Sequence, residues 1–155
     1  MTERYSFRNL IVWEKAQALA VAIIKLMSRI PQSWSNAVLV RQIVSSATSV
    51  GANIAEGHGR YSTGAHRNHL SIARGSAVET DSWLDILRRM SYITPDEEAA
   101  LHDECNQIIA MLSSKMIKLD AELIKDRRIK EETAPYHVTT EQNYSPFTEQ
   151  DYLKN

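Results

Sequence analysis

Apolar residues recur at intervals of three and four along the first 126 residues, and this spacing divides the chain into four segments. In residues 9–29 the repeat is carried by Trp13, Ala16, Ala20, Ile23 and Met27. A helix with 3.6 residues per turn brings such positions onto one face, so this segment is predicted to be an amphipathic helix. Residues 37–57 are predicted to form a second helix, with a stripe that contains Leu39, Ile43, Ala47, Val50 and Ile54.

Two further helices are predicted over residues 63–90 and 95–126, where apolar residues keep the same spacing. The start of the last helix carries a strong local signal. Thr94 can cap it, Pro95 suits the first helical position, and Glu97 can complete a capping box. The breakers Pro31 and Gly57 stand where the first two helices are expected to end.

Four such segments joined by short connections predict an all-α fold, an antiparallel up-down-up-down four-helix bundle with an irregular C-terminal tail. The bundle is assigned to residues 1–128 and the tail to residues 129–155. The tail has two prolines, no helical stripe and four of the eight Phe and Tyr residues, Tyr136, Tyr144, Phe147 and Tyr152. Two interpretations stay open: a disordered tail, or a segment that docks on its own bundle, a neighbouring subunit or a partner.

The composition supports a helical protein of the cytoplasm. Hydrophobic residues make up 43% of the chain but aromatic residues only 7%, and Ala, Leu and Met favour helix over sheet. The single Cys105 excludes an internal disulfide and fits a reducing compartment as a small buried residue. The N-terminus lacks a signal-peptide pattern and no segment reaches a membrane-spanning length, so a soluble cytoplasmic protein is expected, without membrane contact.

Charge is unevenly distributed along the chain. Residues 1–130 hold 17 basic and 14 acidic side chains, whereas residues 131–155 hold one basic and five acidic ones. A mildly basic body therefore carries an acidic tail.

The second half of the segment 37–57 is unusually rich in small residues, which would let another helix approach closely. Gly51 inside a helix costs about 1 kcal/mol relative to Ala, so a packing reason is expected there. Asn53 and Glu56 lie one turn apart beside the start of the next helix. We interpret them as a structural polar lock, Glu56 capping that helix or pairing with Arg60 or Arg74, with ligand contact as the alternative. Glu79 is expected to pair similarly with Arg74 or Arg88.

The sequence offers no pattern typical of an enzyme. His66 and His69 share a helix face but lack the Glu-x-x-His motifs of di-metal bundles, so surface or capping roles are favoured. A nucleophile elbow is missing, and Gly57-His58-Gly59 is only a fragment of a phosphate loop. We expect no catalytic residue, no metal and no cofactor.

Arginines give the most specific functional signal. Between His58 and Arg74 the chain has basic residues and no acid. Arg60, Arg67 and Arg74 are seven apart, so those on the third helix share a face, and Arg60 is expected to approach that face from the corner. Such a stripe could follow phosphates; an ordinary solvated face or salt bridges between subunits would also explain it. Additional candidate contacts are Arg41, Arg88 and Arg89.

Several short motifs together resemble a known family. They are Phe7-Arg8-Asn9-Leu10 with Val12-Trp13, Gln42-Ile43, Asn53-Ile54-Ala55-Glu56-Gly57 with Gly59-Arg60, and Ala73-Arg74-Gly75-Ser76 with Glu79. The chain resembles the 23S rRNA-intervening sequence four-helix-bundle family, related to the accessory variability protein of diversity-generating retroelements. The resemblance covers about residues 7–125. It implies an antiparallel bundle that assembles into a homopentamer. Its retroelement relatives bind nucleic acid and associate with a reverse transcriptase.

The chain departs from the family pattern at two places. Val44 and Ser45 stand where the family commonly has two arginines, and Gly51 replaces a usual proline. The first change removes positive charge from the second helix. It weakens the case for RNA binding and leaves the case for a pentamer unchanged.

The function expected from these observations is that of a non-enzymatic, homo-oligomeric bundle, a pentamer, which binds RNA or DNA weakly and without sequence preference. The alternative is a protein-interaction scaffold or accessory subunit that docks a partner such as a reverse transcriptase, with the tail as docking or regulatory segment. A third class is a small-molecule binder with a pocket near Asn53, Glu56 and His58.

Overall fold

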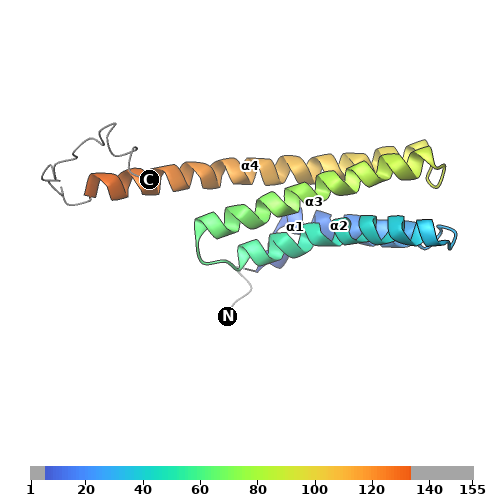
Figure 1. Ribbon diagram of the computed structural model, residues 1–155. Helices are drawn as coiled ribbons and strands as arrows, with labels where there is room; N and C mark the ends of the chain where they lie inside the picture. Colours follow the sequence, from blue (N-terminus) through green and yellow to red (C-terminus); the bar gives the residue numbers. More distant parts are fainter. Residues whose placement is uncertain (1–5, 134–155) are drawn as a thin grey trace, which may run out of the picture.

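The computed structural model describes residues 6–133, which form a short 3-10 turn followed by four α-helices. The turn is η2 (Phe7–Asn9), and the helices are α1 (Ile11–Met27), α2 (Trp34–His58), α3 (Thr63–Arg89) and α4 (Pro95–Thr133). Consecutive helices run in opposite directions and pack side by side (Figure 1). The predicted all-α, up-down-up-down bundle is therefore confirmed for this part of the chain.

The core lies between the helices, and the predicted apolar stripes supply it. Ile23, Ile43, Leu84, Leu87 and Ile108 are completely buried. Contacts are most extensive between α2 and α3 and then between α3 and α4, whereas α1 and α4 have few contacts. The bundle is thus held mainly through α3, which lies between two close neighbours.

The N-terminal motif forms a small aromatic cluster at the start of α1. The Phe7 ring meets the Trp13 ring edge to face, with centroids 5.1 Å apart. The Arg8 guanidinium carbon lies 5.7 Å from the centroid of the Trp13 ring, a cation–π distance. Residues that make the family resemblance thus anchor the chain before the first helix.

Helix α2 starts three residues earlier than the sequence pattern indicated. Its N-cap is Ser33, whose hydroxyl accepts a hydrogen bond from the backbone N–H of Asn36. The Asn36 side chain is buried in the first turn, where its amide donates to the carbonyl of Pro31 at 2.8 Å and its oxygen accepts from the Tyr92 hydroxyl at 3.0 Å. Asn36 can therefore be buried in the first turn of α2, because Tyr92, which is distant in the sequence, satisfies the hydrogen bonding of its side-chain oxygen.

The capping box predicted for α4 is confirmed. The Thr94 N–H donates to Glu97 Oε2 at 2.9 Å, and the Glu97 N–H donates to Thr94 Oγ1 at 3.2 Å. These bonds, and another from Arg29 Nη2 at 2.7 Å, favour the charged carboxylate and lower the pKa of Glu97. The box thus also ties the start of α4 to the end of α1.

Helix α4 extends farther than predicted. It continues to Thr133, so residues 129–133 are helical and the expected irregular tail does not begin at residue 129. The extension projects past the other helices (Figure 1). Lys and Glu dominate it, and residues with a high helix propensity can sustain a helix without burial. The rest of the tail, residues 134–155, lies outside the described residues.

Within residues 6–133, no helix is both long enough and apolar enough to cross a membrane.

The predicted close approach of α2 to α3 is found at Gly57, which is buried. A Cβ atom placed on Gly57 would lie 2.8 Å from the Cβ of His69 and 3.2 Å from the carbonyl oxygen of His66. The first distance is below van der Waals contact, and both neighbours are fixed to the α3 backbone. Gly51 is different, because its close neighbour is the flexible end of Gln17.

We predict that Gly57→Ala destabilises the fold by about 1–3 kcal/mol, because an extra methyl group at a packed helix contact forces the backbones apart. Gly64→Ala is the control, since nothing lies within 4 Å of a Cβ there. Urea denaturation followed by circular dichroism measures both changes. Equal midpoints for the two variants would contradict a close approach at Gly57.

Candidate functional site

A ladder of polar side chains joins α2 to α3. Thr80 donates to Ser46 Oγ at 3.0 Å, and Ser76 donates to Ser49 Oγ at 3.1 Å. Thr80 and Ser46 are buried, so these hydroxyl groups have lost their contact with water. The small residues predicted to allow close packing therefore also supply the hydrogen bonds that the contact requires.

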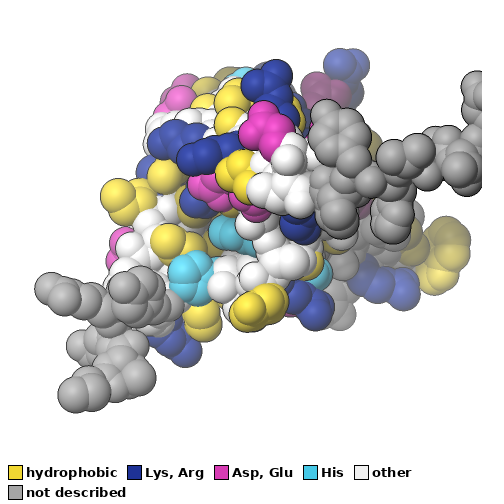
Figure 2. Space-filling view, turned by 90° about the vertical axis from the view of Figure 1, so that its left-hand side faces the viewer, with side chains coloured by type: hydrophobic (Ala, Val, Ile, Leu, Met, Phe, Trp, Pro, Cys, Tyr) yellow, Lys and Arg dark blue, Asp and Glu magenta, His cyan; other side chains and the backbone are white. Residues whose placement is uncertain are grey.

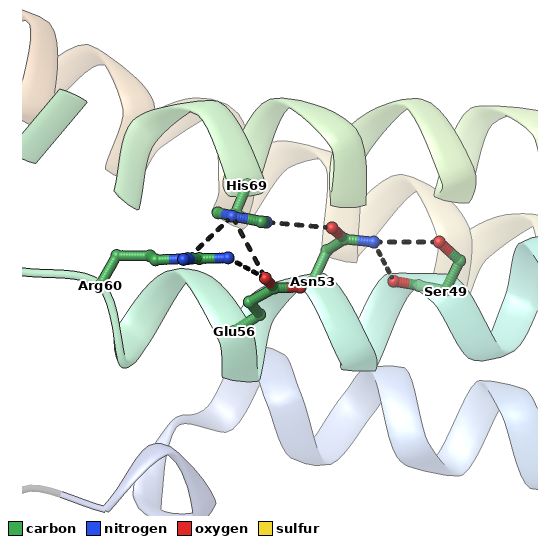
Figure 3. A network of polar contacts seen from close by, with 5 residues as sticks. All are labelled: Ser49, Asn53, Glu56, Arg60 and His69. Atoms are coloured by element: carbon green, nitrogen blue, oxygen red, sulfur yellow. Dashed lines mark hydrogen bonds and ion pairs between the residues drawn. The ribbon is translucent and has the colours of Figure 1, made fainter. Parts of the chain in front are cut away.

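The ladder ends in a cluster around His69 at the α2–α3 corner (Figure 3). Arg60 Nε donates to His69 Nε2 at 3.2 Å, so this nitrogen is the acceptor and the proton of the neutral ring lies on Nδ1. His69 Nδ1 then donates to Asn53 Oδ1 at 3.2 Å. The Asn53 amide donates onward to the Ser49 carbonyl at 2.9 Å. Both ring nitrogens are thus engaged in holding the corner.

Glu56 belongs to the same cluster. Its carboxylate forms an ion pair with Arg60 four residues later, and its Oε1 lies 3.6 Å from His69 Nε2. Pairing with Arg60 was one of the predicted arrangements. Arg74, the other predicted partner, contacts Ser113 of α4 instead. Asn53 and Glu56 are thus placed as a polar lock requires, although the role itself stays a prediction.

The pairing expected for Glu79 is wrong. Glu79 Oε1 accepts a hydrogen bond from Trp83 Nε1 at 3.3 Å and contacts neither arginine. Trp83 is four residues away and therefore a helix neighbour, whereas Arg74 and Arg88 are five and nine residues away and lie on other parts of the helix surface.

Arg67 and Arg74 share one face of α3, as predicted, but this face borders α4. Arg67 Nε donates to Asp120 Oδ1 at 2.9 Å and Nη2 donates to Oδ2 at 3.3 Å. One repeat later, Arg74 Nε donates to Ser113 Oγ at 2.9 Å. The sequence showed no acid near these arginines because the acid comes from another helix, 53 residues away.

Arg60 does not extend this stripe. Its partners lie in the α2–α3 seam, and its contact residue His69 is two positions from Arg67, which places the two about 200° apart around α3. The expected approach of Arg60 to the Arg67 and Arg74 face is therefore wrong. The three arginines occupy two seams on either side of α3.

The remaining candidate arginines differ in their partners. Arg88 Nε lies 3.8 Å from Glu98, and Arg89 Nε donates to Asp85 Oδ2 at 2.7 Å. That bond to Asp85 raises the pKa of Arg89. Arg41 is exposed and forms no ion pair with a described residue. Of the six candidates, only Arg41 and Arg74 lack a carboxylate partner within residues 6–133.

His66 and His69, which the sequence places on one helix face, lie in different surroundings. His69 holds the corner, whereas His66 lines a cavity of about 650 Å³ with His58 and Lys115. Burial lowers the pKa of His66, and so do the positive charges of Lys115 and His58. Asn53 and Glu56 do not line this cavity. The pocket hypothesised near them is thus displaced toward α4, and Lys115 was missed because it is 49 positions from His66.

Neither a metal nor a reactive thiol emerges from the described part of the chain. Among residues 6–133 there is no group of three or more His, Cys, Asp or Glu side chains that could hold a metal ion. Cys105 is buried, and burial, followed by the nearby Asp81 and Glu104, raises the pKa of its thiol to about 12. The thiol therefore stays protonated and inert, as predicted for a small core residue.

Comparison with known proteins agrees with the resemblance seen in the motifs. The family model described as 23S rRNA-intervening sequence protein matches residues 8–114. A crystal structure of a protein with unknown function, from the S23 ribosomal protein family of Bacteroides thetaiotaomicron VPI-5482, is similar with a TM-score of 0.64 and 33% sequence identity. That likeness covers 68% of this chain and 98% of the other. A search of the curated proteins finds no match.

We predict that the pKa of His66 lies below the ordinary histidine value of 6.5 and that the pKa of His102 lies above it. The hydrogen bond that His102 donates to Asp81, followed by the charge of Asp81, raises the pKa of His102, whereas burial lowers the pKa of His66. The contribution of the neutral His66 ring to the stability of the fold is therefore fully present above pH 6.5, and it is lost as the pH falls. Stability from protonated His102 is present below 6.5 and is lost as the pH rises. NMR titration of the ring resonances measures both midpoints.

The variant Asp81→Asn provides the control, since Asp81 Oδ1 lies 2.6 Å from His102 Nδ1. It should lower the midpoint of His102 and leave that of His66 in place. A common midpoint for both rings in the parent protein would show that their surroundings do not differ in this way.

Proposed function

Because the chain belongs to the 23S rRNA-intervening sequence protein family, we propose that it is a non-enzymatic helical bundle that assembles with copies of itself and binds nucleic acid. The assembly is a homopentamer, and the ligand is structured RNA or DNA, bound weakly and without sequence preference. No cofactor takes part.

Arg74 is the observation that carries the nucleic-acid part of this proposal. Its side chain is exposed on α3, and its hydrogen bond to Ser113 leaves the guanidinium without a carboxylate among residues 6–133. A guanidinium held by a neutral hydroxyl keeps its full charge and its terminal N–H groups for a phosphate. Exposed Arg41 has the same lack of an acidic partner and adds a second contact point.

The ion-paired arginines can join such an interface by exchanging partners. The side chains of Arg67 and Asp120 are 37% and 44% exposed, so water screens their pair. Exposed ion pairs contribute only about 0–1 kcal/mol, which a phosphate that makes the same paired bonds can replace. Each exchange still has to overcome the existing pair, and this cost supports weak binding. The same argument applies to Arg60, Arg88 and Arg89.

Exposed apolar side chains on the outer surface of α3 support self-association. Ile72 is 44% exposed, Val78 47% and Ile86 37%. All three belong to α3, and none of them is part of the buried core. A surface of this kind on a helix that is already packed on both flanks is typical of contact with another subunit.

A second candidate function is that of an accessory subunit for a protein such as a reverse transcriptase. Helix α4 is 39 residues long, whereas α3 has 27, and its last turns extend beyond the bundle (Figure 1). Ile129 on this extension is exposed, and so is Ile124 shortly before it. An isolated helix end with apolar residues offers a partner protein a face to bind. This function would also relate the chain to the accessory protein of diversity-generating retroelements.

We predict that a labelled structured RNA binds the full chain at low salt and that binding weakens steeply toward physiological salt, because released counterions drive it. Arg74→Gln should weaken binding and lower the slope of log affinity against log salt by about 1. Lys25→Gln is the control, an exposed cation on α1 outside the candidate set. Fluorescence anisotropy measures both slopes.

Equal affinities at low and high salt would contradict the role of the arginines. Absence of binding at either salt would contradict the nucleic-acid part of the proposal and would favour the accessory function.

We predict that the full chain has a solution mass of about five times its chain mass of 17.6 kDa. Ile72→Glu should reduce this mass, since a charge placed in an apolar contact between subunits loses its hydration. Tyr61→Glu, at a fully exposed position in the α2–α3 turn, should leave the mass unchanged. Light scattering after gel filtration provides the masses. A monomer of the parent chain at micromolar concentration would refute the assembly.

A further inference from the structure

A cavity at one end of the bundle brings all four helices together. Its volume is about 650 Å³, and its lining comes from the start of α1, the end of α2, the first turns of α3 and the middle of α4. Figure 2 looks onto this end of the molecule, where histidine side chains reach the surface among lysine and arginine. The size lies within the range of about 300–1,000 Å³ that is usual for small-molecule sites.

The deep part of the cavity is apolar. Ile54, Leu70 and Leu112 are nearly completely buried core residues that also line it, and Val12 and Met111 continue this lining from α1 and α4. Methyl and thioether groups of this kind favour an aliphatic or aromatic body over water. A phosphodiester backbone would lose its hydration here, so this surface is unsuited to nucleic acid.

The polar part of the lining is basic. Lys115, His66 and His58 contribute to it, and none of the residues that line the cavity is acidic. The Lys115 ammonium makes no ion pair with any residue in the range 6–133. Its charge also acts on the cavity, because Lys115 helps to lower the pKa of His66, against a smaller opposing effect of Glu122. The start of α1, whose N-cap Leu10 offers no side-chain acceptor, adds a second source of positive potential.

An apolar interior with a basic rim matches one class of ligand. We propose that this cavity binds a small organic carboxylate with an aliphatic or aromatic body. Lys115 pairs with the carboxylate, the neutral His66 ring donates a hydrogen bond to it, and the body lies against Ile54, Leu70 and Leu112. This site is separate from the arginine seams and does not depend on nucleic-acid binding.

The test is a calorimetric titration of the full chain with octanoate, which has both the charge and the apolar body that the cavity calls for. We expect one octanoate per chain. Two matched probes separate the two contributions: octan-1-ol keeps the apolar body without charge, and acetate keeps the charge without the body. Each should bind at least about tenfold more weakly than octanoate, the factor that corresponds to 1.4 kcal/mol.

Two variants place the ligand in the cavity. Lys115→Met removes the charge but keeps most of the length of the side chain, and it should weaken octanoate about tenfold, to the level of octan-1-ol. Lys118→Met is the matched control, because Lys118 is exposed on the same helix and does not line this cavity. Met111→Trp should fill the half-buried part of the lining and abolish binding, while the circular dichroism spectrum stays that of the parent.

The proposal predicts that octanoate shifts the NMR signals of the His66 ring and raises its titration midpoint, since a bound anion stabilises the protonated form. Equal weakening by Lys115→Met and Lys118→Met would overturn it, because this would indicate a diffuse surface effect. Equal binding of octan-1-ol and octanoate, or no binding of octanoate, would overturn it as well.

Discussion

Helices α2 and α3 meet through small and polar side chains, so every polar group that they bury must find its partner inside the contact. Thr80 pairs with Ser46 in the interior and Ser76 pairs with the partly buried Ser49, and Asn53 and His69 continue the ladder to the corner. No buried side-chain nitrogen or oxygen within residues 6–133 is left without a hydrogen bond. Because an unsatisfied buried group would cost about 1–3 kcal/mol, this pattern fixes the register of the two helices.

The register of α2 and α3 has consequences at the end of the bundle. It places Gly57 against the backbone of α3, which brings His66 to the side of the helix that faces α1 and α4. α1 packs on α4 only loosely, and the cavity lies where these two helices meet the corner. The close contact between α2 and α3 and the loose contact between α1 and α4 thus leave room for the ligand that we propose.

The candidate arginines differ in the partners that they have within the bundle. Arg60 pairs with a carboxylate in the α2–α3 contact and Arg67 with one in the α3–α4 contact, whereas Arg74 donates a hydrogen bond to a serine. The bundle therefore offers a few free cations and several that must first release a partner. This distribution fits the weak, salt-dependent binding that we propose better than it would fit tight binding.

The sequence by itself determined the four helices, their core faces and the capping box at Thr94, because helix period and capping are local properties of the chain. It also indicated that the small-residue half of α2 packs closely on another helix, although it expected the packing reason at Gly51 and treated Gly57 as a breaker. Pairing of Glu56 with Arg60, four residues away, was one of the arrangements that it left open. Its estimate of where α4 ends fell short, since residues 127–133 form helix without an apolar stripe. Only the tertiary structure decided that Arg67 meets Asp120, that Arg60 lies in the other seam, and that His66 and Lys115 share a cavity. These contacts depend on how helices rotate and slide against one another, and packing of the whole bundle sets that arrangement.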